Sequence, residues 1–114
     1  MDHDDDNVLN LEALAITEGE DPPGHAFRVT ARGAIDIATA ARLHDLLTGL
    51  IDGGAHLVVL DIQDIQFLDS SGLRVLVLAG DRLADAGGQL LIEGMSGAVQ
   101  RVLEITGLLD HYRR

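Results

Sequence analysis

Two serine hydroxyls and one carboxylate stand together in the middle of the chain, at Asp69, Ser70 and Ser71. The apolar stretch 65–68 ends there and a helix-like pattern begins at once, as where a strand passes into a helix through a tight turn. The first turn of a helix presents unpaired N–H groups and the positive end of the helix dipole. Two interpretations follow: Asp69 or Ser70 caps the helix, or a serine is a regulated modification site.

The absence of lysine and the acidic net charge exclude several functions. The net charge is −11, and all eight basic residues are arginines. Without lysine the chain has no Walker A loop, no Schiff-base chemistry and no standard phospho-aspartate receiver site. The acidic charge also argues against nucleic acid and anionic membranes as partners, because both are bound mainly through Lys and Arg. It favours partners that are basic or mixed-charge proteins.

The length indicates one domain, and the N-terminal composition together with the lack of a long apolar run makes the cytoplasm the expected location. At 114 residues the chain can bury a core without disulfides, and it contains no cysteine. The first seven residues are acidic, unlike a signal peptide, and no apolar run approaches the ~20 residues that span a bilayer. We therefore expect a disordered acidic tail over residues 1–7 and a single domain over residues 8–114. The histidine spacing gives no metal-ligand pattern, and no metal or cofactor is expected.

The order of the predicted elements indicates an α/β fold. Alternation predicts a hairpin of strands over 8–17 and 26–34, joined by a Pro/Gly-rich turn. Helices are predicted over 38–52, 71–86 and 96–106, the first capped by Asp36 or Thr39 and the last by Ser96, with Gly107 just after it. Buried strands are predicted over 56–62, continuing toward Leu68, and over 89–93. This order predicts a mixed sheet, an N-terminal hairpin plus parallel strands, with helices packed on it.

The helix after the serines has a face that could bind a partner. At 100° per residue its inward face is predicted to carry Leu73, Leu76, Val77, Gly80, Leu83 and Ala84. The outward face is predicted to carry Ser71, Arg74, Val75, Leu78, Arg82 and Asp85. Single exposed aliphatic residues are ordinary. Here, however, two aliphatic side chains rimmed by arginines follow a candidate regulatory serine, as in the apolar centre and polar rim of a docking surface.

Several stretches resemble the STAS domain family, specifically its small bacterial anti-sigma-factor antagonists. The most specific is Phe67-Leu68-Asp69-Ser70-Ser71-Gly72-Leu73. Gly33-Ala34-Ile35-Asp36 resembles the family's element before the first helix, and Val59-Leu60-Asp61-Ile62 resembles its central strand. Val102-Leu103-Glu104-Ile105-Thr106-Gly107-Leu108 resembles its last common helix and Gly-Leu exit. The similarity runs from about Leu9 to Leu109.

This resemblance implies a binding module rather than an enzyme. Antagonists of the family bind an anti-sigma factor that is a serine kinase, which releases the sigma factor. The kinase uses ATP to phosphorylate the second serine of the motif, here Ser71, and a phosphoserine phosphatase reverses the modification. The resemblance places Asp36, Asp69 and Ser70 beside the kinase-binding surface, and it implies that residue 72 is glycine so that the kinase backbone can approach Ser71. With Arg74, Val75, Leu78 and Arg82 from the helix face, these are the predicted partner-binding residues of a monomer or weak dimer.

Two other roles compete with this prediction. One is a non-switching STAS subunit that docks on a transporter ATPase or a signalling scaffold. The other is an enzyme, which we regard as the weaker hypothesis because the chain has no Gly-x-Ser-x-Gly elbow and no histidine placed by the sequence near Ser71. Which sigma factor, kinase and stimulus are involved does not follow from the sequence.

Overall fold

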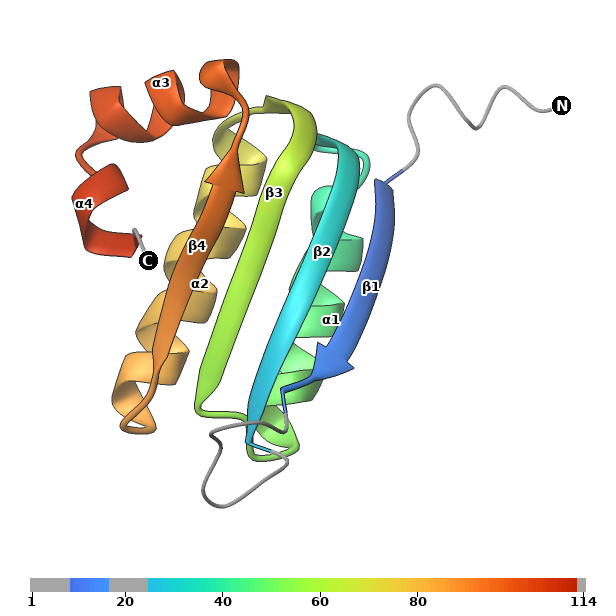
Figure 1. Ribbon diagram of the computed structural model, residues 1–114, viewed down its shortest axis with the longest axis vertical. Helices are drawn as coiled ribbons and strands as arrows, with labels where there is room; N and C mark the ends of the chain where they lie inside the picture. The colour runs from blue at the N-terminus through green and yellow to red at the C-terminus, as the bar shows by residue number, and fades with distance from the viewer. Residues whose placement is uncertain (1–8, 17–24, 113–114) are drawn as a thin grey trace, which may run out of the picture.

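A computed structural model describes residues 9–16 and 25–112, so the tail predicted over residues 1–7 lies outside the described residues. Within these ranges, strands and helices alternate after an initial hairpin (Figure 1). The elements are β1 Leu9–Ala15, β2 Ala26–Ile35, α1 Ala40–Asp52, β3 Leu57–Leu68, α2 Ser70–Asp85, β4 Gln89–Met95, α3 Gly97–Thr106 and α4 Leu109–Tyr112.

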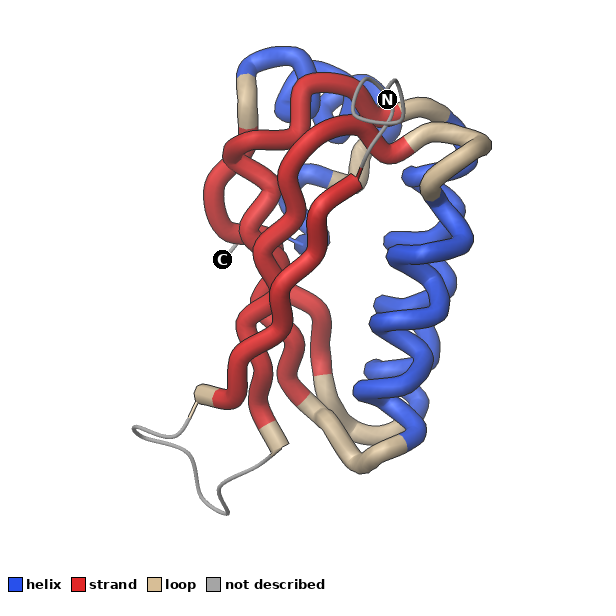
Figure 2. Tube along the Cα trace, turned by 90° about the vertical axis from the view of Figure 1, so that its right-hand side faces the viewer, coloured by secondary structure: helices blue, strands red, loops and turns tan. Residues whose placement is uncertain are grey.

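The described strands form one mixed sheet in the order β1-β2-β3-β4. β1 is antiparallel to β2, and β2, β3 and β4 are parallel to one another, which confirms the predicted hairpin followed by parallel strands. Figure 2 shows α1 and α2 together on one face of the sheet. The core lies between these two layers, where Leu43 of α1, Leu76 of α2 and Leu60 of β3 are fully buried. α3 and α4 lie beyond the β4 edge (Figure 1).

β3 continues to Leu68, as the sequence predicted, and it is irregular near its end. Its pairing with β2 shifts twice, between Thr30 and Arg32 and between Gly33 and Ala34, so β3 contains an extra residue at each shift. Such bulges bend a strand and change the direction of the residues that follow. After the second shift Leu68 pairs with Ile35, and both side chains enter the core.

The C-terminal part contains both confirmed and unexpected features. The Ser96 hydroxyl accepts a bond from the Val99 N–H at 3.3 Å and donates to the Ile65 carbonyl at 2.9 Å, which confirms the predicted cap of α3 and ties it to β3. The sequence did not predict α4. It buries Tyr112 against α2 at Gly80, where an added Cβ would lie 2.8 Å from the ring. Burial, with a smaller effect of Asp81, raises the pKa of the Tyr112 phenol.

None of the helices within residues 9–16 and 25–112 is both long enough and apolar enough to cross a lipid bilayer.

Candidate functional site

Two acidic turns meet at the carboxyl end of the parallel strands. Asp36 directly follows β2 and Asp69 directly follows β3. The register pairs Ile35 with Leu68, and the backbone N–H of Asp69 donates to the Ile35 carbonyl at 3.2 Å. The turn before α1 and the first turn of α2 are therefore held side by side. Ligand sites commonly lie at this end of open α/β sheets.

Asp69 caps α2. Its Oδ1 atom accepts hydrogen bonds from the backbone N–H groups of Ser71 at 2.8 Å and Gly72 at 3.2 Å. The extended backbone of Asp69, at φ −104° and ψ −170°, is typical of an N-cap. Of the two caps that the sequence allowed, Asp69 is confirmed, whereas Ser70 is the first helical residue and does not cap. The cap fixes the backbone of Ser71.

The two serine hydroxyls are available to a partner. Ser70 is exposed and Ser71 is partly exposed at the start of α2. Neither hydroxyl makes a hydrogen bond to another of the described residues. The backbone N–H groups of Ser71 and Gly72 could donate hydrogen bonds to a phosphoryl group on Ser71, but they already donate to the carboxylate of Asp69. A phosphoryl group there would add roughly −1.5 to −2 charges beside an existing negative charge.

Replacing Asp69 with alanine should destabilise the domain by about 1 kcal/mol, the usual loss for an N-cap side chain. The reason is that two N–H donors at the start of α2 lose their acceptor. Urea denaturation of the two proteins measures this difference. Asp69→Asn keeps a capping oxygen and should recover most of the stability. An Asp69→Ala protein as stable as the parent would show that the cap does not hold the start of α2.

The turn before α1 is held by a second carboxylate. Asp36 Oδ1 accepts hydrogen bonds from the N–H groups of Ala38 at 2.9 Å and Thr39 at 3.1 Å. The Thr39 hydroxyl, which is buried, donates to the Ala34 carbonyl at 2.8 Å and accepts from the Asp36 N–H at 3.0 Å. Thr39 occupies the N-cap position, but its side chain does not cap α1. Both residues named by the sequence therefore stabilise the turn, and Asp36 is the one whose side chain accepts from the N–H groups that follow it.

The prediction that Val75 is exposed is wrong, because this side chain is only 7% exposed. Arg82, two helical turns further along the same flank of α2, forms an ion pair with Asp52 of α1 at 2.5 Å. That flank faces α1, which covers Val75. Ala84, predicted to face inward, is exposed. The buried face of α2 is accordingly Gly72, Val75, Leu76, Ala79, Gly80 and Leu83.

Gly72 has a packing role that the sequence did not predict. The residue is buried between α2 and the sheet, where an added Cβ would lie 2.7 Å from Ile35 Cγ2 and closer still to Leu68 Cδ1. Its missing side chain therefore serves the packing of α2 on the strands. That a glycine here also lets the kinase backbone approach Ser71 stays a prediction.

The remaining predicted residues lie at increasing distances from Ser71 along α2. Arg74 is exposed one turn away and forms no ion pair with the described residues. Leu78 is two turns away and 43% exposed. Arg82 is eleven residues away, about 16 Å along the axis, and is engaged with Asp52. The site thus brings together Asp36, Asp69, Ser70, Ser71 and Arg74, with Leu78 at its margin and Arg82 outside it.

Sequence reasoning missed Ile37, which is 83% exposed in the turn before α1. It belongs to neither the strand alternation nor the helical periodicity, so no pattern drew attention to it. The available signal was an isoleucine inside a turn, where a β-branched apolar residue gains nothing from local structure.

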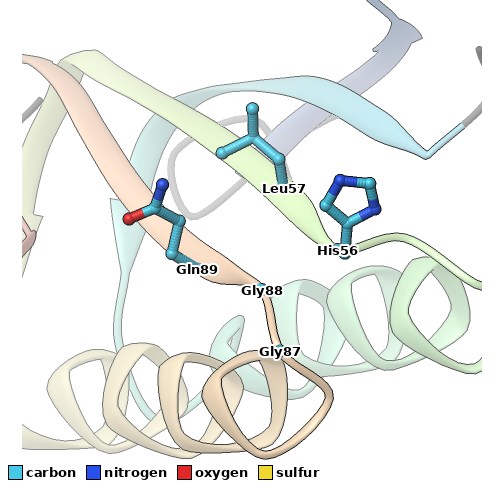
Figure 3. Close-up of a pocket in the computed structure, with 5 residues that line it drawn as sticks. All are labelled: His56, Leu57, Gly87, Gly88 and Gln89. Atoms are coloured by element: carbon cyan, nitrogen blue, oxygen red, sulfur yellow. The ribbon is translucent and has the colours of Figure 1, made fainter. Parts of the chain in front are cut away.

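A hollow of about 360 Å³ lies at the opposite end of the sheet, where β3 and β4 begin (Figure 3). Its lining comprises His56, Leu57, Gly87, Gly88 and Gln89. None of the predicted site residues borders it. The rings of His25 and His56 meet edge to face near this end, with centroids 5.5 Å apart.

Comparison with known proteins gives consistent results. The family model described as STAS domain matches residues 20–113. The anti-sigma-B factor antagonist of Bacillus subtilis is 35% identical over 84 residues, covering 74% of this chain and 76% of that protein. The protein of the same name from Staphylococcus aureus is 30% identical over 84 residues, covering 74% of this chain and 78% of that protein.

Solved structures share the fold. The unphosphorylated anti-sigma factor antagonist SpoIIAA superimposes with a TM-score of 0.74 at 14% identity, covering 90% of this chain and 86% of that chain. An anti-sigma factor antagonist from Mycobacterium paratuberculosis gives 0.69 at 24% identity, covering 89% and 83%. The murine anion transporter Slc26a9 gives 0.69 at 16% identity, covering 93% of this chain but 20% of the transporter. With a family model that covers most of its length and the same mixed sheet, this chain belongs to the STAS domain family.

Proposed function

We propose that this chain is an anti-sigma factor antagonist that acts in the cytoplasm. In this proposal it binds an anti-sigma factor that is a serine kinase, and phosphorylation of Ser71 ends the complex until a phosphoserine phosphatase restores it. The observation that carries the proposal is the geometry of Ser71, whose hydroxyl makes no hydrogen bond to the other residues that the structure describes and whose backbone is fixed by Asp69. The names of the relatives from Bacillus subtilis and Staphylococcus aureus support the same role.

The position of Ser71 suits a switch because it separates the stability of the fold from the stability of the complex. The serine is the second residue of α2, where the helix dipole favours negative charge by about 0.3–1 kcal/mol. The domain can therefore carry a phosphoryl group without unfolding. A partner that covers Ser71 must instead remove water from that charge next to the Asp69 carboxylate, at a cost of several kcal/mol.

The direct test incubates the protein with its cognate anti-sigma kinase and ATP and maps the modified residue by mass spectrometry. We expect phosphate on Ser71 and none on Ser71→Ala, although Ser70 next to it is more exposed. Phosphate on Ser70, or a stable kinase complex without any phosphorylation, would contradict the assignment of Ser71.

The second candidate, a non-switching subunit of a transporter ATPase or a signalling scaffold, makes the opposite prediction. A negative charge at residue 71 would then leave the complex intact. The similarity to Slc26a9 concerns the fold alone and does not favour this candidate.

A further inference from the structure

We propose that Ile37 is an apolar anchor of this chain, inserted on binding into a pocket of the partner that is bordered by basic side chains. This inference rests on the proposed function, since the partner is taken to be the anti-sigma factor. Neither the serine motif nor the face of α2 contains Ile37.

The exposure of Ile37 comes with a fixed backbone. The side chain is 83% exposed, the highest value among the large apolar side chains of the described residues. The turn that carries it is held by the hydrogen bonds of Asp36 and Thr39, and the N–H of Ala40 donates to the Asp36 carbonyl at 2.8 Å. A fixed aliphatic group loses little conformational entropy on binding, so it is well suited to anchor an interface.

The surroundings of Ile37 allow a partner to approach closely. Ala38 and Ala41 beside it are both exposed. Ala41 lies three helical turns before Asp52, and Ser71 lies three turns before Arg82, the residue that Asp52 binds. Because α1 and α2 run in the same direction, Ala41 and Ser71 lie on facing flanks. Ile37 lies two residues after Ile35, whose carbonyl accepts from the Asp69 N–H, so a partner that covers the first turn of α2 also lies close to the turn that carries Ile37.

The charges around Ile37 indicate which side chains of the partner border the pocket that receives it. The carboxylates of Asp36 and Asp69 lie in the two adjoining turns. Among the described arginines, Arg74 lies one turn after Ser71 along α2, and Arg42 in the first turn of α1 donates to the Leu9 carbonyl. The chain as a whole carries a net charge of −11. A complementary surface has an apolar pocket for one branched side chain and Lys or Arg around it.

The test compares two isoleucines of nearly equal exposure. Ile105 on α3 is 78% exposed, and α3 lies beyond the opposite edge of the sheet from α1 (Figure 1). Titration calorimetry against the purified anti-sigma kinase should show Ile37→Ala binding about 10- to 100-fold more weakly than the parent. Ile105→Ala should bind like the parent, and neither variant should change the thermal midpoint, since both side chains are exposed.

The outcomes separate this inference from the proposed function. If Ile37→Ala binds as tightly as Ile105→Ala while the parent protein binds the kinase, the anchor is overturned and the proposed function stands. If the parent protein does not bind the kinase, both fall. Raising NaCl from 0.1 to 0.5 M should weaken the parent and Ile37→Ala by the same factor, because salt screens the rim charges and not the apolar contact. If the affinity did not change with salt, the prediction that basic side chains of the partner surround the pocket would be wrong.

Discussion

Ser71→Asp is expected to weaken binding to the anti-sigma factor by about 100-fold or more while the domain stays folded. The fold tolerates the charge because residue 71 is the second residue of α2. The complex does not tolerate it, because Asp69 already accepts the hydrogen bonds of the N–H groups that could have stabilised a second carboxylate. A partner covering this turn would have to remove water from two neighbouring negative charges of this chain, at a cost of several kcal/mol.

The measurement is the dissociation constant for the purified kinase, with a control for charge alone. Ala98 is exposed at the second position of α3, the position that Ser71 occupies in α2. Ala98→Asp adds the same charge at an equivalent helix position and should leave binding unchanged. Ser71→Ala should bind like the parent. Unchanged binding by Ser71→Asp would reject the switch and favour a non-switching subunit.

Much of the fold followed from local patterns. The alternation of β2, the continuous apolar run that begins β3 and the caps at Asp69 and Ser96 each depend on residues close together in the chain. Such signals report hydrogen bonds within a few residues and the side of a strand that is buried. They were sufficient for the mixed sheet and for the position of Ser71 at the start of α2.

The errors arose where the answer depended on another element. α2 has apolar residues on two flanks, and its periodicity alone does not reveal which flank α1 covers. The buried stripe that includes Val75 is therefore rotated by about one residue from the prediction, and the ion pair of Arg82 with Asp52 becomes visible only once the helices are placed. Ile37 was missed for a related reason, because its exposure is a property of the assembled turn.

Gly72→Ala tests the packing role of this glycine. Alanine raises helix propensity by up to about 1 kcal/mol, which favours the variant. Against this, the new methyl group would meet Ile35 Cγ2 at 2.7 Å, the Ile35 carbonyl oxygen at 3.1 Å and Leu68 Cδ1. Ile35 and Leu68 are buried and cannot move aside freely, and overpacking a core costs about 1–3 kcal/mol. We expect the cost of overpacking to exceed the gain in helix propensity, so that urea denaturation shows a free energy of unfolding about 1–2 kcal/mol lower than that of the parent.

Gly49→Ala provides the matched control for this prediction. Gly49 is exposed within α1, and nothing lies within 4 Å of its added Cβ, so the same substitution should stabilise the protein by about 0.5–1 kcal/mol. The two glycines should thus change stability in opposite directions. If Gly72 served only the approach of a partner, Gly72→Ala would be at least as stable as the parent and would lose only binding. A stable Gly72→Ala protein would therefore leave this residue a role in the docking surface alone, whereas an unstable one places it in the contact that seats α2 on the sheet.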